Sequence, residues 1–269
     1  LAYFLADRIA ARRNSALVRA VRANQWVVSG GELRGEALDR QARQVIRNTA
    51  RSIYDLHHDL GRETILNQLL DQADDLKKLL QRPRFAERGL VVVGLHLGNF
   101  DFVLQAAFLL GAQALVLTVP ELSGGYRLQY EMRRKTGMEL LPATLGSLRR
   151  CIEHLRRGGW VVTGMDRPVE KPICRPCFFG RQASLPVHHI QLALKADVPL
   201  RVAATLRNPD GSYRFLISEP LEMERGGERM IELKRNAEAA CREAEGFIRM
   251  APDQWSMSFP VWQEALLEV

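Results

Sequence analysis

Apolar side chains recur at helical spacing over the first 80 residues of the chain. The repeat runs through Leu1, Phe4, Leu5 and Ile9, and later through Ile46, Ala50, Ile53 and Leu56. Residues three or four apart share one face of an α-helix. The pattern therefore predicts that this part of the chain is helical.

The pattern changes after Arg88, where residues 90–95 form the apolar run LVVVGL. Such a run is typical of a strand that is covered on both faces. Further on, apolar runs of strand length alternate with segments of helical periodicity. The expected strands are residues 114–119, 139–142, 160–165, 200–206 and 213–218. The expected helices are residues 100–110, 125–135, 145–157, 187–196 and 227–250.

This alternation predicts an α/β fold with a central mixed, largely parallel β-sheet flanked by helices. A helical N-terminal region, residues 1–85, is expected to pack on an α/β core of residues 86–269 within a single domain. Residues 166–185 are rich in proline and read as an irregular loop after a strand. The turn Asn208-Pro-Asp-Gly211 predicts a hairpin between the last two strands.

Composition and charge narrow the class of protein. The 269 residues are 46% hydrophobic and 26% charged, which is ordinary for a globular protein and excludes disordered and collagen-like chains. The net charge of +7 favours anionic partners. No apolar run approaches the roughly 20 residues of a membrane-spanning helix.

The first 22 residues form a basic amphipathic segment. Its basic residues are Arg8, Arg12, Arg13, Arg19 and Arg22. Such a segment can lie on an anionic membrane surface. The alternative is a solvated arginine face on a helix that packs against the rest of the protein.

The segment 96–101, His-Leu-Gly-Asn-Phe-Asp, follows the first buried strand. Ligands of open α/β sheets collect at the carboxyl ends of the strands, where His96 lies. Asn99 is placed to cap the next helix, with Asp101 in its first turn. A turn that folds back over this helix would let Asp101 hold one nitrogen of His96, while the other takes a proton from a hydroxyl. The alternative is a solvated histidine and an acidic residue that complements the helix dipole.

This segment resembles the His-X4-Asp/Glu signature of the glycerolipid acyltransferase superfamily. Its sequence, HLGNFD, is similar to the HxGNW(E/D) form of this signature. That form is found in bacterial lipid A biosynthesis (late) acyltransferases and in the related phosphatidylinositol mannoside acyltransferases. Further blocks resemble the same family in the same order: residues 21–56, EMRRKTGMELLP at 131–142, WVVTGMDRP at 160–168, FFGRQASLP at 178–186 and DQWSMSFPVW at 253–262. Phe100 and Asp101 stand where lipid A enzymes usually have Trp and Glu. An Asp at the position of Asp101 is similar to the pattern of the mannoside acyltransferases and of many glycerol phosphate acyltransferases.

The resemblance implies transfer of a fatty acyl group from a thioester, acyl-CoA or acyl carrier protein, to a hydroxyl of a lipid or glycolipid. His96 would deprotonate that hydroxyl and Asp101 would orient His96. The reaction needs no metal and no cofactor besides the donor. A phosphatidylinositol mannoside-type or lysophospholipid acyltransferase is the alternative. The identity of the acceptor, the acyl chain length, the choice of donor and the oligomeric state stay open.

The same resemblance implies substrate-binding residues and a location. The candidates are Asn99, Arg133, Arg134, Asp166, Arg167, Phe179 and Gly180. The guanidinium groups can bind phosphate or pyrophosphate. Asp166 can pair with an arginine of the site or form a structural ion pair. Phe179 and Gly180 can turn the loop back onto the core, with contact to the acyl chain as the alternative role. The expected location is the cytoplasmic face of the bacterial inner membrane, either peripheral or anchored by a segment upstream of Leu1.

The remaining candidates carry weaker signals. Cys174 and Cys177 form one CxxC, whereas a structural zinc site needs two such half-sites, so we expect loop cysteines and no metal. His188 and His189 are expected to cap a helix, and Cys151 and Cys241 to lie in the core. The net charge of +7 makes a basic nucleic-acid-binding protein without catalysis a more remote alternative. The sequence shows no nucleic-acid recognition module, and its aromatic residues are not interleaved with basic ones, so nucleic acid is not an expected partner. A hydrolase of the same fold, which uses water in place of the acceptor hydroxyl, is a third hypothesis.

Overall fold

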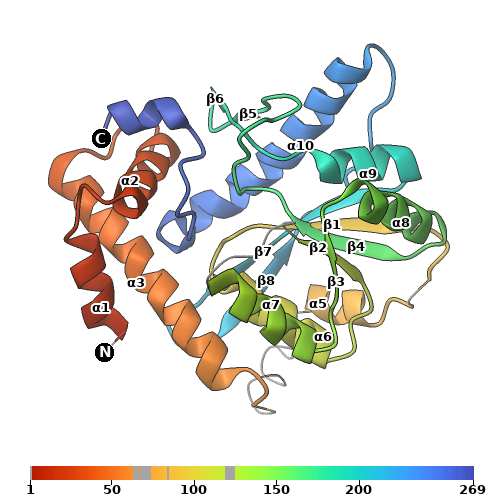
Figure 1. Cartoon of the computed structure of the whole chain (residues 1–269), viewed down its shortest axis with the longest axis horizontal. Coiled ribbons are helices and arrows are strands. Elements are labelled where there is room, and N and C mark those ends of the chain that lie inside the picture. The colour runs from red at the N-terminus through yellow and green to blue at the C-terminus, as the bar shows by residue number, and fades with distance from the viewer. Residues whose placement is uncertain (1, 63–65, 67–73, 84, 119–124) are drawn as a thin grey trace.

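The central sheet has six strands in the order β3-β2-β4-β1-β7-β8 (Figure 1). The structure is a computed structural model that describes residues 2–62, 66, 74–83, 85–118 and 125–269. The strands are β1 (Leu90–Gly94), β2 (Leu115–Thr118), β3 (Glu139–Pro142), β4 (Trp160–Gly164), β7 (Leu200–Arg207) and β8 (Tyr213–Ile217). All neighbours pair in parallel except β7 and β8, which form the predicted antiparallel hairpin. The predicted mixed, largely parallel sheet is confirmed.

Helices cover both faces of the sheet (Figure 1). One face carries α8 (Leu145–Arg156), α9 (His188–Ala196) and α10 (Arg229–Met250), and the other carries α5 (Asp74–Leu80), α6 (Phe100–Leu109) and α7 (Gly125–Lys135). Alternate side chains of β1 point to opposite faces of the sheet and so belong to two different cores. Val91 and Val93 join the core beneath α8, α9 and α10, whereas Leu90 and Val92 join the core beneath α5 and α6.

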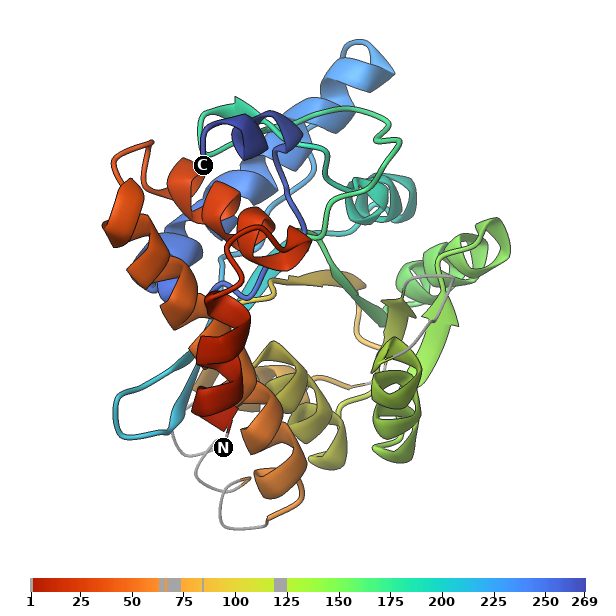
Figure 2. The same ribbon diagram turned by 60° about the vertical axis from the view of Figure 1, so that its left-hand side comes forward.

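Three further helices form the predicted N-terminal helical region, α1 (Ala2–Ala10), α2 (Ala16–Val28) and α3 (Gly35–Asp59). Figure 2 shows α1 lying along α3 on the outside of the molecule, with the C-terminus close to α2. The amide nitrogen of Asn24 on α2 donates to the carbonyl oxygens of Met257 and Phe259, at 3.0 and 2.8 Å. The N-terminal region is therefore bonded to the last segment of the chain, which includes η1 (Pro252–Gln254) and η2 (Gln263–Leu267).

Two features differ from the sequence predictions. The loop after β4 contains a short hairpin, β5 (Cys177–Phe178) and β6 (Arg181–Gln182), whose turn uses left-handed backbone at Phe179 and Gly180. The basic segment of residues 1–22 is divided between two helices. Several of its arginines serve the fold, since Arg13 and Arg22 pair with Asp39 and Arg19 donates to a carbonyl of η2.

The turn between β1 and α6 is fixed by Gly98. Its φ is +59°, and a Cβ there would collide with the carbonyl oxygen of Thr205 on β7. The backbone on either side is also held, because Gly98 N–H donates to Gln254 and Leu97 pairs with Trp255. Only glycine fits this close approach of two backbones.

We predict that Gly98→Ala destabilises the protein more than Gly111→Ala. Both residues have positive φ, but a Cβ on Gly111 meets nothing within 4 Å. Gly111→Ala should lower the free energy of unfolding by about 1–2 kcal/mol through backbone strain, and Gly98→Ala by about 1–3 kcal/mol more through the collision. Urea unfolding of the two variants measures the difference, and equal losses would contradict it.

Candidate active site

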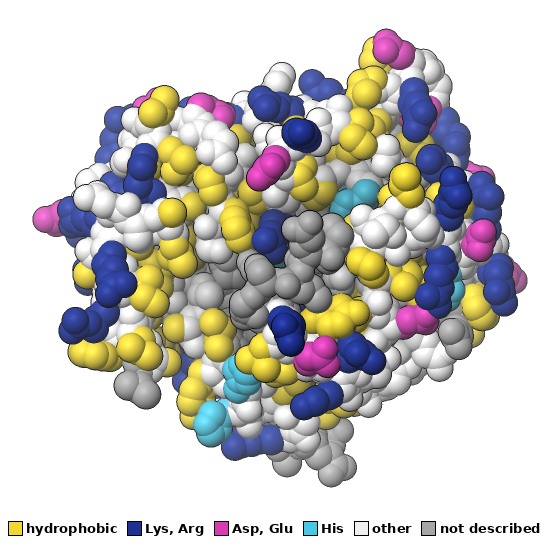
Figure 3. Space-filling model, viewed as in Figure 1, with side chains coloured by type: hydrophobic (Ala, Val, Ile, Leu, Met, Phe, Trp, Pro, Cys, Tyr) yellow, Lys and Arg dark blue, Asp and Glu magenta, His cyan; other side chains and the backbone are white. Residues whose placement is uncertain are grey.

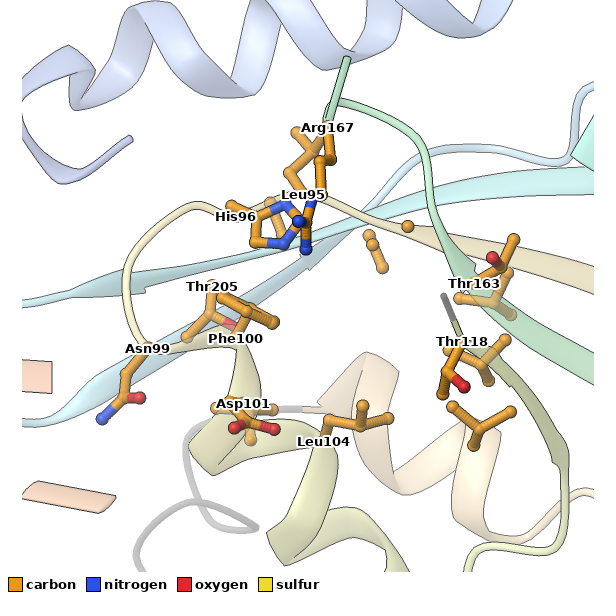
Figure 4. A pocket seen from close by; sticks show the side chains of 18 of the residues that line it. Leu95, His96, Asn99, Phe100, Asp101, Leu104, Thr118, Thr163, Arg167 and Thr205 are labelled. Atoms are coloured by element: carbon orange, nitrogen blue, oxygen red, sulfur yellow. The ribbon is translucent and has the colours of Figure 1, made fainter. Parts of the chain in front are cut away.

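A cavity of about 520 Å³ lies between the sheet and helices α3, α5 and α6. We call it the central cavity. Its sheet side consists of Val92, Gly94, Val116, Thr118, Trp160, Val162, Gly164, Ala203 and Thr205, and α6 contributes Val103, Leu104, Ala107 and Phe108. Most of this surface is apolar. Polar side chains gather at the carboxyl ends of the strands, where the sequence predicts a site (Figure 4).

His96 lies at this end of the cavity, just after β1. Its Nδ1 lies 2.7 Å from Oδ1 of Asp166, and its backbone N–H donates to Oδ2 of the same carboxylate at 2.9 Å. The imidazole is 29% exposed, whereas the Asp166 side chain is fully buried. With Nδ1–H donated to Asp166, Nε2 carries the lone pair that can accept a proton.

Asp166 is held from a second side by the C-terminal segment. Trp255 Nε1–H donates to Asp166 Oδ2 at 2.8 Å. Burial alone raises the pKa of this carboxyl, but the charge interaction with His96 and the hydrogen bonds from His96 and Trp255 outweigh it and hold the pKa below its ordinary value. Asp166 is therefore a permanent carboxylate at neutral pH.

The backbone carbonyl oxygen of His96 also accepts hydrogen bonds. It accepts the backbone N–H of Ser256 at 2.8 Å and the Ser256 hydroxyl at 2.9 Å. The ring packs edge-on against Phe100, with the centroids 4.6 Å apart. The imidazole is thus fixed by its backbone, by a carboxylate and by an aromatic ring before any ligand binds.

Asp101 does not hold His96, contrary to the sequence prediction. Its Oδ1 accepts from Nε of Arg133 on α7 at 2.8 Å, and Figure 4 shows Asp101 on α6, apart from His96. Asp166 pairs with His96 and not with an arginine, which was one of the two alternatives for it, and so takes the place expected for Asp101. Asp101 Oδ2 is buried and has no hydrogen-bond partner among the described residues, so a buried charge faces this part of the cavity.

Two of the predicted arginines line the cavity. Arg133 lies on the α6 side through its bond to Asp101, and Arg167 follows β4 at the carboxyl end of the sheet. The guanidinium carbon of Arg167 is 4.4 Å from the ring centroid of Phe259. Figure 4 shows His96 and Arg167 together at one side of the cavity. The guanidinium of Arg167 can meet an anionic group of a ligand beside His96.

The other predicted substrate-binding residues lie differently. Asn99 lines the cavity, but its amide nitrogen donates to Ser52 O and Tyr213 Oη at 3.1 and 3.0 Å. Asn99 precedes α6 as predicted, without the expected side-chain cap. Arg134 and Gly180 are not part of the cavity wall. Phe179 is not part of it either, and it packs against Phe178 and Trp262 of an aromatic cluster.

The histidine pair of α9 does not form the predicted cap. His188 lines the cavity and its Nε2 lies 3.0 Å from Thr163 Oγ1, which donates to the carbonyl of Leu117. Since that hydroxyl proton is used, His188 Nε2 is the donor to Thr163. Burial lowers the pKa of His188 to about 4 and, together with the charge of His188, holds the pKa of His189 well below its ordinary value. Both rings are neutral at pH 7.

The cysteines lie outside the cavity. Cys151 and Cys241 are buried in the core as predicted, and all four thiols are unpaired. Cys177 begins the β5 strand, and its backbone N–H donates to Glu238. Within the described ranges, no group of three or more His, Cys, Asp or Glu side chains is arranged to hold a metal ion.

Sequence reasoning missed Trp255 and Ser256 as partners of the site. They lie 89 and 160 residues from the groups that they bind, Asp166 and His96. No local periodicity signals a contact across that distance. The signal that could have pointed to them is that both lie in DQWSMSFPVW at 253–262, one of the blocks that resemble the family.

One comparison with known proteins assigns the chain to a family. Residues 42–264 match the model of the family described as bacterial lipid A biosynthesis acyltransferase. No curated protein matches the chain. The matched region contains the whole sheet, His96, Asp166 and Trp255.

The neutral histidines predict a pH-dependent stability. Unfolding restores an ordinary histidine pKa of about 6.5, so between pH 6.5 and about 4 the unfolded chain binds more protons than the folded chain. Acidification through this range should lower the free energy of unfolding, by roughly 3 kcal/mol for His188.

We expect His188→Gln to lose less stability on acidification than the wild type. His57→Gln, at an exposed position on α3, is the control and should follow the wild-type curve. Urea unfolding at a series of pH values measures the slope. Parallel curves for His188→Gln and wild type would show that His188 is not held neutral by the fold.

Proposed function

Since the chain belongs to the bacterial lipid A biosynthesis acyltransferase family, we propose that it transfers a fatty acyl group from a thioester to a hydroxyl of a lipid or glycolipid acceptor. The reaction takes place at His96, at the polar end of the central cavity. The donor is an acyl group on coenzyme A or on acyl carrier protein. Neither a metal nor a further cofactor takes part in the proposed chemistry.

The observation that carries this proposal is the hydrogen bond from His96 Nδ1 to the buried Asp166. It fixes the tautomer in which Nε2 accepts a proton, and it stabilises the imidazolium that forms. A general base requires this state at neutral pH. The proposed orienting residue is therefore Asp166 and not Asp101.

The proposed reaction needs one proton transfer in each direction. His96 Nε2 takes the proton of the acceptor hydroxyl as its oxygen attacks the thioester carbonyl carbon. The tetrahedral intermediate collapses with cleavage of the carbon–sulfur bond, and the thiolate leaves with the proton that His96 gives back. Arg167, at the same end of the cavity, is placed to attract the anionic part of a donor or acceptor.

The apolar part of the central cavity suits the hydrocarbon of the acyl group. Each methylene removed from water contributes about 0.8 kcal/mol to binding, so a long chain binds well in an apolar channel. The pair Asp101–Arg133 lies on the α6 side of the same space. A phosphate-bearing lipid is the acceptor class that we favour, because Arg133 and Arg167 flank the cavity. Phosphatidylinositol mannosides and lysophospholipids belong to that class as well as lipid A precursors.

We further propose that α1 rests on an anionic membrane surface, at the cytoplasmic face of the bacterial inner membrane. Its large apolar residues Tyr3, Phe4, Leu5 and Ile9 are 41–60% exposed, and Arg8 and Arg12 lie among or next to them. On the neighbouring α3, Ile53 is half exposed and also lines the cavity. The helix that packs along α1 thus carries an exposed apolar side chain that also belongs to the cavity wall.

The face seen in Figure 3 does not gather its positive charge in one patch. Figure 3 shows Lys and Arg side chains distributed over one whole face, with hydrophobic side chains between them. Within the described part of the chain, no helix has the length and hydrophobicity needed to span a membrane. The proposed contact therefore depends on α1 and α3.

We predict that His96→Ala lowers kcat for acyl transfer by about 10²-fold to 10⁴-fold, as expected for loss of a general base. Asp166→Asn keeps the size of the side chain but removes the charge that stabilises the imidazolium, and should lower kcat by about 10²-fold or more. Transfer to a lipid acceptor is followed by mass spectrometry, which also separates acylated lipid from free fatty acid. Wild-type kcat in a folded His96→Ala protein would falsify the mechanism.

Asp101→Asn is the matched comparison for Asp166→Asn. It removes the partner of Arg133 and should change KM for a phosphate-bearing acceptor more than kcat. If Asp101→Asn lowers kcat as strongly as Asp166→Asn while KM is unchanged, Asp101 and not Asp166 supports the base. If the wild type releases only free fatty acid, the protein is a hydrolase.

For the membrane contact, we predict that the protein sediments with anionic vesicles and less with neutral ones. Each arginine near an anionic leaflet contributes about 1 kcal/mol. Arg8→Gln with Arg12→Gln should therefore weaken sedimentation, and Phe4→Ser with Leu5→Ser should weaken it at any salt concentration. Arg13→Gln is the control, because this arginine pairs with Asp39. Unchanged sedimentation of both double variants would place the contact elsewhere.

A further inference from the structure

On β1 and β4 the side chains that face the central cavity grow larger from the carboxyl end of each strand to its other end. On β4 the residues on the cavity side are Gly164, Val162 and Trp160, because alternate residues share one face of a strand. The paired strand β1 repeats the order, since Gly94, Val92 and Leu90 lie beside them in register. Along these two strands the side chains leave the most space beside the glycines and the least beside Trp160.

The wide end is the reactive end. A Cβ on Gly164 would lie 3.7 Å from Cε1 of His96 and 4.0 Å from the carbonyl oxygen of Gly94. Glycine at both positions leaves the space beside the imidazole open. A chain that starts at His96 can therefore pass over Gly94 and Gly164 into the cavity.

The narrow end is closed by packed side chains. Trp160 is 5% exposed and belongs to the same buried cluster as Leu79, Leu90 and Ala114. Leu79 of α5 and Ala112, which precedes β2, line the cavity with it. A chain that reaches Trp160 meets a wall and not an exit.

We infer that Trp160 and Val162 set the length of the acyl chain that the protein transfers. The inference rests on the proposed function, and its ligand is the saturated hydrocarbon chain of the acyl donor. The carbonyl carbon of the donor must lie at His96 for reaction, so the distance from His96 to Trp160 limits the number of methylenes that follow it. The taper selects by length because each methylene beyond the wall must displace a packed side chain.

The donor fits this cavity better than a hydrocarbon chain of the acceptor. Selection by length needs one fixed starting point, and the donor supplies it through the reacting carbonyl carbon. The acceptor's fixed point is its hydroxyl oxygen, from which its chains extend by routes that the reaction does not fix. The two sources of hydrocarbon are separated by varying the length of the donor and of the acceptor in independent series.

The test uses two substitutions that act in opposite directions on the whole protein. Val162→Phe fills the middle of the cavity and should shift the preferred donor to shorter chains. Trp160→Leu opens the closed end and should shift the preference to longer chains. Val161→Ala is the control, because Val161 is fully buried on the opposite face of the same strand. The measurement is kcat/KM for a series of saturated acyl donors at one acceptor.

A misplaced methylene in an apolar pocket changes kcat/KM by about 10-fold to 200-fold. We expect Val162→Phe to lower kcat/KM by at least about 10-fold for the donor that the wild type prefers, with short donors retained. Val161→Ala should keep the wild-type length profile. Thermal unfolding identifies a variant that does not fold, and Val162→Ala, which should favour longer chains, replaces Trp160→Leu in that case.

The outcomes separate this inference from the proposed function. An unchanged donor profile in active, folded variants overturns the inference and leaves acyl transfer standing, and so does a shift in the acceptor series alone. If the wild type transfers no acyl group, displacement of a fluorescent fatty acid by saturated fatty acids of graded length still measures the cavity. Variants that do not move the length optimum in that binding assay overturn the inference without any reference to activity.

Discussion

The buried carboxylate of Asp166 is the interaction on which the site depends. A fully buried charge is costly unless it is paired and hydrogen-bonded, and Asp166 accepts three bonds, two from His96 and one from Trp255. These bonds join the loop after β1, the end of β4 and the C-terminal segment. The position of the imidazole is therefore determined by segments that are distant in sequence and meet at one carboxylate.

The fold was largely predictable because its signals are local. The run of residues 90–95 and the hairpin turn at 208–211 each identify a strand or a connection within about ten residues, and the helices between strands follow the 3.6-residue period. The short β5–β6 hairpin was missed because two-residue strands carry no periodicity. Its turn depends on Phe179 in a left-handed conformation, which is uncommon for a residue with a Cβ.

The site was predictable only in part. The end of a buried strand correctly placed His96 in a cavity, but the carboxylate partner was assigned by closeness in sequence. Asp101 lies five residues from His96 and Asp166 lies seventy, yet parallel pairing of β1 with β4 brings Asp166 nearer. The register of a sheet decides such contacts, and a single sequence does not reveal it.

The bonds to the C-terminal segment have a consequence for the order of assembly. Trp255 and Ser256 reach His96 and its carboxylate only after residues 1–256 have been synthesised, and Asn24 bonds the same segment to α2. A nascent chain that already contains the sheet can therefore bond His96 to Asp166 but lacks the bonds from Trp255 and Ser256. Docking of the C-terminal segment beside β1 then completes the set of bonds that fix the imidazole.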